Sequence, residues 1–263
     1  MGQSITCYGA RVGVRVSDPG VLPALLDRLP SGWQSRPAKT VDRLYSLVVG
    51  RNGDGRVRRF NLLYGDIELL ARTRGLDEAL DAFAADVQLH IAEHASRRVF
   101  VHAGVVGWRG RAIVMPGRTF TGKTTLVREL VRAGATYYSD EYAVLDQRGR
   151  VHPFPRPLEI RPRGGYAQER HSVESIGGVA GDGPLPVGFV VVTQYDARVQ
   201  GWRPRRLSVG QGVLELLAHA VAARRKPEAV LEALDRVAAD AQVLKGRRGE
   251  AERVATRILE LAS

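Results

Sequence analysis

The stretch that decides the fold is AIVMPGRTFTGKTTLVREL, residues 112–130. From Gly117 it runs G-R-T-F-T-G-K-T, which matches the phosphate-loop pattern G-x-x-x-x-G-K-[ST] at every fixed position. The apolar run RAIVMP before the loop is typical of a strand, and KTTLVRELVRAG after it is typical of a helix closed by Gly134. Strand, loop and helix in this order are the context that the pattern requires, so we predict an α/β domain that binds a nucleotide phosphate chain.

Such a loop wraps backbone N–H groups around phosphate oxygens and adds the positive end of a helix. Lys123 is then placed to bridge the terminal phosphates, and the Thr124 hydroxyl to hold a magnesium ion. The predicted nucleotide-binding residues are Gly117, Arg118, Thr119, Phe120, Thr121, Gly122, Lys123, Thr124 and Thr125. Many ATPases, GTPases and small-molecule kinases share this loop, so it does not by itself name a reaction.

Composition is that of an ordinary globular protein, with 44% hydrophobic and 25% charged residues among 263. The formal net charge is +11, yet lysine occurs only four times and the arginines are scattered over separate segments. No aromatic residues interleave with them, so specific nucleic-acid binding is not favoured. No apolar run is long enough for a membrane span. No secretory signal is evident, and a single cysteine, Cys7, fits a reducing cytoplasm.

Two regions are expected, a small α+β region over 1–96 and the phosphate-loop domain over 97–263. In the first, residues 5–16 alternate like one strand, residues 21–29 favour a short helix, and 43–71 favour two or three antiparallel strands with a turn at NGDG. Residues 76–95 have apolar side chains at helical spacing. His90 and His94 lie one turn apart there, but no third metal ligand is evident.

The second region begins with two strands around WRGR within 97–117, and two more are predicted at YAVLD (142–146) and VGFVVVTQY (187–195). Between these two lies a Gly- and Pro-rich stretch, 161–186, that we interpret as a long loop and a candidate substrate lid. From residue 210 onward the chain is predicted to be mostly helical, with helices over 210–225, 226–241 and 250–262.

An acidic pair, Asp140 and Glu141, follows the first helix in GATYYSDEYAVLD. With VHAGVVGWRGRAIVMPG (101–117) and GKTTLVRELVRAGATYYSDEYAVLD (122–146), this arrangement resembles the catalytic domain of the HPr kinase/phosphorylase-related family, some of whose members modify peptides. The likeness covers roughly residues 98–162 and implies a fold similar to that of ATP-dependent phosphoenolpyruvate carboxykinase. The family histidine corresponds to His102, the phosphate loop to 117–124, and the acidic pair to Asp140 and Glu141.

The resemblance implies an ATP- and Mg²⁺-dependent kinase acting on a Ser/Thr hydroxyl of a protein or peptide. Asp140 is the candidate base, and Thr124 and Glu141 are the candidate magnesium ligands. Lys123 is assigned to the β- and γ-phosphates, and His102 either lies near the transferred phosphate or tunes Asp140. Arg161 and Arg163 are candidates for clamping phosphate or an acidic substrate group. Assembly into hexamers, as in that family, stays open.

Two alternatives remain at this stage. The same scaffold serves small-molecule kinases and carboxykinase-like enzymes. It also suits a nucleotide-binding accessory module without phosphotransferase activity, which is favoured by Phe120 at a loop position usually occupied by glycine in the family.

Overall fold

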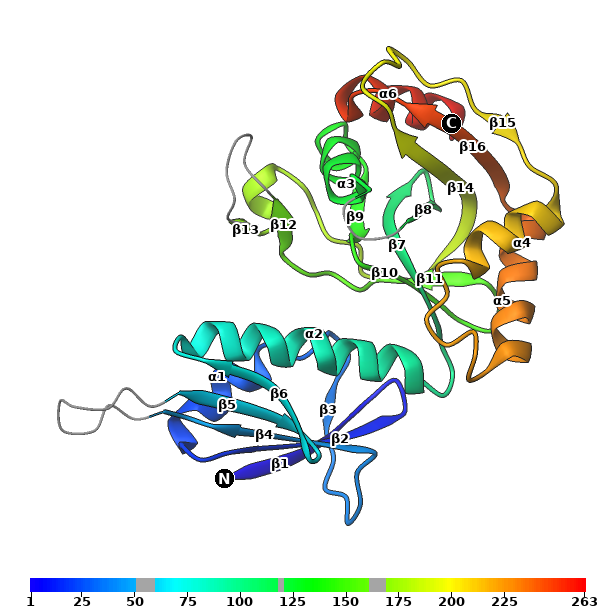
Figure 1. Cartoon of the computed structure of the whole chain (residues 1–263). Helices are drawn as coiled ribbons and strands as arrows, with labels where there is room; N and C mark the ends of the chain where they lie inside the picture. The colour runs from blue at the N-terminus through cyan, green and yellow to red at the C-terminus, as the bar shows by residue number, and fades with distance from the viewer. Residues whose placement is uncertain (51–59, 118–120, 161–168) are drawn as a thin grey trace. The chain divides into compact units, whose positions relative to one another are not determined.

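The computed structural model describes residues 1–50, 60–117, 121–160 and 169–263. The chain divides into two compact units, Met1–Arg97 and Arg98–Ser263, one residue from the boundary expected from the sequence. The mixed α/β class predicted from the sequence is confirmed, since both units combine sheets with helices (Figure 1). The NGDG turn, the loop residues Arg118, Thr119 and Phe120, and both Arg161 and Arg163 lie outside the described residues.

The first unit is a six-stranded sheet of order β3-β1-β2-β4-β5-β6 with one long helix against it. Its helix α2 buries one face, including Leu80, Phe83, Val87 and Ile91, as the helical spacing predicts. The elements are β1 (Gly2–Cys7), β2 (Ala10–Val16), α1 (Leu22–Leu26), β3 (Gln34–Ser35), β4 (Arg43–Val48), β5 (Asn61–Gly65), β6 (Glu68–Thr73) and α2 (Leu76–His94).

The single strand expected over residues 5–16 is wrong. The chain instead turns at Tyr8 and Gly9 and forms the hairpin β1–β2, in which Cys7 pairs with Ala10. Both turn residues have positive φ, 50° at Tyr8 and 92° at Gly9, and glycine adopts that region without steric cost.

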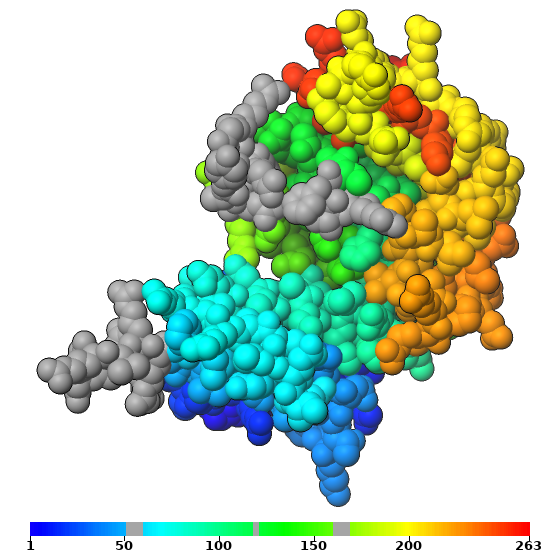
Figure 2. All heavy atoms as spheres, in the orientation of Figure 1, coloured from blue at the N-terminus to red at the C-terminus, as the bar shows by residue number. Residues whose placement is uncertain are grey.

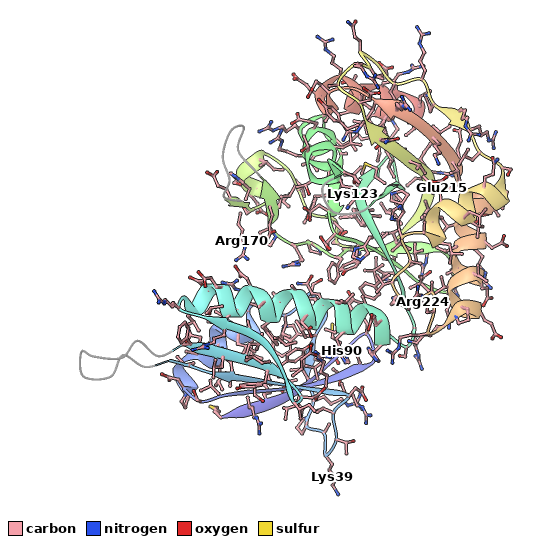
Figure 3. The ribbon with its side chains drawn as sticks, viewed as in Figure 1. Lys39, His90, Lys123, Arg170, Glu215 and Arg224 are labelled. Carbon is pink, nitrogen blue, oxygen red and sulfur yellow. The ribbon has the colours of Figure 1, made fainter. Side chains whose placement is uncertain are left out.

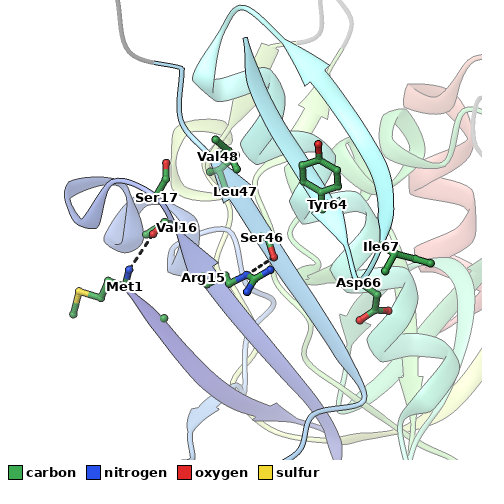
Figure 4. Close-up of a pocket in the computed structure, with 11 residues that line it drawn as sticks. Met1, Arg15, Val16, Ser17, Ser46, Leu47, Val48, Tyr64, Asp66 and Ile67 are labelled. Atoms are coloured by element: carbon green, nitrogen blue, oxygen red, sulfur yellow. Dashed lines mark hydrogen bonds between the residues drawn. The ribbon is translucent and has the colours of Figure 1, made fainter. Parts of the chain in front are cut away.

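A hollow of about 830 Å³ lies on the first unit, where β1, β2, β4 and β5 supply most of the lining (Figure 4). The Met1 amino group donates to the Val16 carbonyl at 3.0 Å, and Arg15 Nε donates to Ser46 Oγ at 2.7 Å. Ile67 on its rim is 98% exposed, so this sheet face carries apolar surface in solvent.

The second unit is built on an eight-stranded sheet whose main path is β11-β10-β7-β8-β14-β16-β15, with β9 beside β7. Strands β8, β14 and β16 run parallel to one another, so their carboxyl ends meet at one edge. The strands are β7 (Val99–Trp108), β8 (Arg111–Pro116), β9 (Thr136–Ser139), β10 (Tyr142–Leu145), β11 (Arg150–His152), β14 (Leu185–Tyr195), β15 (Arg205–Arg206) and β16 (Gln242–Arg248).

Helices cover both faces of this sheet and bury a core on each. On β8, Ala112 and Val114 belong to the core beneath α4 (Val209–Leu217) and α5 (Pro227–Asp240). Ile113 and Met115, which alternate with them, belong to the core beneath α3 (Lys123–Arg132) and α6 (Ala251–Leu261). This alternation explains why strands buried on both faces have nearly continuous apolar sequences.

Three sequence expectations for this unit need correction. The helix expected over 210–225 is shorter, since α4 ends at Leu217. The stretch 161–186 is not a loop throughout, because β13 (Glu169–His171) pairs with β12 (Leu158–Ile160) and a 3₁₀ turn follows at Glu174–Ile176. The helical C-terminal part is interrupted by β16, which was not anticipated. Among the described residues, no helix is long and apolar enough to cross a membrane.

Candidate functional site

The loop that follows β8 is held at both ends by backbone contacts. At its start, the buried Gly117 donates its N–H to the His102 carbonyl at 3.1 Å. At its end, Gly122 has φ 81° and its carbonyl accepts the first hydrogen bond of α3, from Leu126 N at 3.1 Å. Helix α3 then directs the N–H groups of its first turn, which have no intrahelical acceptor, toward the loop.

Close packing against glycine brings α3 and the loop near the central strands. A Cβ at Gly104 of β7 would lie 2.5 Å from Val127 Cγ2, and a Cβ at Gly117 would lie 2.8 Å from Thr121 Oγ1. A side chain at Gly104 would therefore clash with the buried Val127, whereas one at Gly117 would require Thr121 to move. The apolar face of α3, including Leu126, Val127 and Leu130, packs into the core on this side of the sheet.

Lys123 is the first residue of α3, and its side chain is half-buried (Figure 3). Its Nζ donates to the Gly117 carbonyl at 2.8 Å, so the ammonium lies back across the loop. Burial lowers the pKa of Lys123, while the carboxylates of Glu141 and Asp140 act in the opposite direction. The ammonium and both carboxylates thus share one electrostatic environment.

The acidic pair occupies an interruption in the sheet. Strands β9 and β10 pair with successive parts of β7, and Asp140 and Glu141 are the two residues between them. The Ser139 hydroxyl accepts from the N–H groups of Glu141 (3.1 Å) and Tyr142 (3.0 Å), which fixes this turn. Such interruptions re-aim side chains and are common beside functional sites.

Asp140 is the buried member of the pair, with 9% of its surface exposed. Thr124 Oγ1 donates to its Oδ2 at 3.2 Å, and the Tyr137 hydroxyl donates to its Oδ1 at 3.0 Å. Burial raises the pKa of Asp140 to about 6, and these two hydrogen bonds only partly offset it. The carboxyl group therefore changes protonation close to neutral pH.

Glu141 differs from Asp140 in exposure and in charge state. Its side chain is 41% exposed, and its Oε1 lies 3.6 Å from His102 Nδ1. Burial works against its ionisation, but the His102 contact and the charges of Lys123 and Arg156 are stronger, so its pKa is lowered. Adjacent carboxylates whose pKa values are pushed apart are a common arrangement for acid–base work.

His102 lies on β7, and its ring is 4.7 Å from that of Tyr142, with which it pairs across β7 and β10. The structure thus brings together His102, Gly117, Lys123, Thr124, Asp140 and Glu141, all named from the sequence. Thr121 and Thr125 are exposed at the loop and the start of α3.

Three residues of this site were not anticipated from the sequence. Tyr137 connects Asp140 to the rest of the fold, because its hydroxyl oxygen also lies 2.9 Å from the Arg156 carbonyl oxygen. Arg156 lowers the pKa of both carboxyl groups. Arg248, at the end of β16, is 2% exposed and donates from Nη2 to the Gly122 carbonyl at 3.0 Å.

Arg248 could not be connected with the loop from its sequence position, 126 residues away. Its contact depends on β16 running parallel to β14, which places its last residue at the edge where the loop begins. Burial lowers the pKa of its guanidinium, although the charge of Glu250 opposes this.

Among the described residues, no group of three or more His, Cys, Asp or Glu is arranged to hold a metal ion. Magnesium is commonly held by one or two carboxylates together with phosphate oxygens and water, so a pair of carboxylates beside a hydroxyl is the relevant arrangement. Thr124, Asp140 and Glu141 supply such oxygen donors.

Comparisons with known proteins add no relationship to this geometry. No protein-family model matches the chain, and the comparison with curated proteins finds no significant match.

Proposed function

We propose that the second unit is a kinase of the HPr kinase/phosphoenolpyruvate carboxykinase type, dependent on ATP and Mg²⁺. It would transfer the γ-phosphate to a Ser or Thr hydroxyl of a protein or peptide. The observation that carries this proposal is the hydrogen bond from Thr124 Oγ1 to Asp140 Oδ2, 3.2 Å. It joins the residue after the loop lysine to a buried carboxyl whose pKa of about 6 suits a general base.

The described part of the loop fits a nucleotide phosphate chain. The backbone of the loop is closely approached at Gly117 and Gly122, where a Cβ would lie 2.8 Å from Thr121 Oγ1 and 2.7 Å from Arg248 Nη2, and the N-terminal turn of α3 follows directly. An anion at that position gains from the N–H groups and from the helix dipole. The Lys123 ammonium, which rests on the Gly117 carbonyl, is close enough to exchange that contact for a phosphate oxygen.

The oxygen donors also fit magnesium, which prefers hard ligands. Thr124 and Glu141 are the residues that would hold it, with Asp140 behind them. When bound, the ion supplies neutralisation of charge on the phosphate oxygens. The chain contributes by keeping Glu141 ionised through His102 and Lys123.

Asp140 is assigned the task of accepting the proton of the attacking hydroxyl. Its carboxyl group can do this once it is ionised, above about pH 6. Tyr137 and Thr124 hold both oxygens of Asp140, so the carboxylate keeps one orientation. Positioning of this kind is the main contribution that a protein makes to phosphoryl transfer.

The test uses the full chain, γ-labelled ATP and Mg²⁺, with a Ser/Thr peptide library and a lysate of the source organism as acceptors. Mass spectrometry then locates the label. We compare the wild type with Asp140→Asn and Lys123→Ala. The matched control is Lys39→Ala, because Lys39 is an exposed lysine of the other unit (Figure 3).

We expect label on a Ser or Thr hydroxyl with wild type and Lys39→Ala, and at least a roughly hundredfold loss with the two site variants. Label found only on a small molecule would replace the proposal with a small-molecule kinase. ATP binding that depends on Lys123, without label transfer in any mixture, would refute the kinase and identify a nucleotide-binding accessory module.

A further inference from the structure

A second cavity lies on the second unit, at the carboxyl ends of β14 and β16. Its volume is about 510 Å³, within the range of pockets that bind ligands. Residues 192–194 and 245–247 of the two strands line it, together with Arg203 and Arg205. The segment around residue 200, yellow in Figure 2, lies on the surface of this unit.

Strand register gathers three cations on one face of the sheet, and a fourth lines the same cavity. Arg205 pairs with Lys245 across β15 and β16, and Arg247 lies two residues further along β16, so these three side chains share a face. Arg203, two residues before β15, also lines the cavity. Arg206, which pairs with Leu244, belongs to the opposite face.

The carboxylates near the cavity neutralise only part of this charge. Lys245 pairs with Glu215 of α4, which Figure 3 labels, and Arg247 Nη1 lies 3.4 Å from Asp196 Oδ2. Asp196 also forms an ion pair with Arg198, whose Nε lies 3.1 Å from Asp196 Oδ1. Among the described residues, Arg203 and Arg205 have no carboxylate within the 4.0 Å of an ion pair, so the cavity carries excess positive charge.

The chemistry of the lining selects the ligand class. Guanidinium groups pair with carboxylates through two parallel hydrogen bonds, which favours acidic side chains. None of the described residues that line the cavity is aromatic, so it has no platform on which a nucleic-acid base would stack. An extended polypeptide segment rich in Asp or Glu supplies carboxylates for the guanidinium groups and needs no aromatic residue on which to stack.

The cavity and the candidate active site share the carboxyl edge of the sheet. Arg247 lines the cavity, whereas the next residue, Arg248, contacts the Gly122 carbonyl at 3.0 Å, so their side chains leave β16 on opposite faces. Ligands of α/β sheets bind outside the carboxyl ends of the parallel strands, which is where both features are found. We propose that this cavity binds an acidic segment of the polypeptide that receives the phosphate, an inference that rests on the proposed function.

The experiment measures binding directly and needs no phosphoryl transfer. A fluorescein-labelled peptide of alternating Glu and Ser is titrated with the full chain and followed by anisotropy, beside a Gln/Ser peptide of equal length. The test variant is Arg203→Gln/Arg205→Gln. Arg206→Gln/Arg253→Gln is the matched control, since both of those arginines are exposed and outside the cavity.

We expect the Glu peptide to bind and the Gln peptide not to bind. The cavity variant should weaken binding about tenfold or more, whereas the control should change it less than about twofold. Equal weakening by both variants, or no binding of the Glu peptide, would overturn the cavity as a recognition site. Tighter binding of a single-stranded oligonucleotide, with the same dependence on Arg203 and Arg205, would overturn the polypeptide assignment.

Two further arms separate this proposal from the kinase. ATP is added to the peptide complex of Lys123→Ala, and displacement of the peptide there would show that the cavity takes the nucleotide and would overturn the proposal. Arginine-dependent peptide binding, together with no label transfer to this peptide, the peptide library or the lysate, would support the cavity and refute the kinase. If label is transferred to the peptide equally well by the wild type and by Arg203→Gln/Arg205→Gln, the kinase would be supported and the cavity would be overturned as its recognition site.

Discussion

The buried carboxyl group of Asp140 makes the free energy of unfolding depend on pH in a definite direction. Its pKa rises from the usual 3.8 to about 6 in the fold, chiefly because burial disfavours the charged form. An unfolded chain loses this proton at lower pH than the native one. Stability from this group is therefore complete below about pH 4 and is lost as pH rises through about 6. The shift corresponds to about 3 kcal/mol.

The perturbation that tests this is Asp140→Asn, which keeps the shape of the side chain but cannot ionise. Relative to this variant, the wild type should lose roughly 2 kcal/mol of its free energy of unfolding between about pH 4.5 and about pH 7.5. Urea denaturation of both proteins over this range measures the difference. Asp235→Asn, at an exposed position on α5, is the matched control.

The free energy of unfolding of the wild type should thus fall relative to that of Asp140→Asn as pH rises. The control variant should show no comparable trend. A difference that stays constant over the range would refute the raised pKa. If the wild type instead became more stable relative to Asp140→Asn as pH rises, the fold would stabilise the charged form of Asp140. That result would remove the physical basis for its role as a base near neutral pH.

Four other substitutions have expected outcomes. Tyr137→Phe removes a hydrogen bond that lowers the pKa of Asp140, so the acidic limb of the kcat/KM profile should move up by about one pH unit, and an unmoved limb would contradict this. Gly122→Ala and Gly134→Ala both place a side chain at positive φ and should each cost about 1 kcal/mol in denaturation. Only Gly122→Ala, whose Cβ would lie 2.7 Å from Arg248 Nη2, should weaken ATP binding in calorimetry, and equal affinity in both variants would argue against that contact. Arg248→Met should weaken ATP binding about tenfold with little change in the free energy of unfolding. The substitution loses the hydrogen bonds from Nη1 to Gly249 and from Nη2 to Gly122, but it also removes a buried charge whose Nε has no hydrogen-bond partner among the described residues; a large loss of stability would show that the residue is structural.

Much of the fold around the loop follows from local pattern. The predicted strands around WRGR are β7 and β8, and the predicted amphipathic helices over 76–95 and 250–262 are α2 and α6. These elements have a clear apolar period of their own. Strand β16 has none, since QVLKGRR mixes apolar and charged residues and lies between two helices. It is a strand because it pairs with β14, far from it in sequence.

The candidate site likewise has some features that follow from the local sequence and others that depend on the fold. The sequence by itself determined the residue types of the loop, the strand before it, the helix after it, and the adjacency of Asp140 and Glu141, because each is a matter of short-range order. It could not predict which of the two carboxyl groups is buried, because they are neighbours in the chain.

Only the tertiary structure decided that Asp140 is buried with a raised pKa while Glu141 is ionised beside His102. It alone also brought Arg248 to the loop and four cations to the lining of one cavity. Burial and charge–charge distance are set by packing between distant segments, and a pKa is set by burial and distance. The chemistry available to the site is therefore a property of the folded chain.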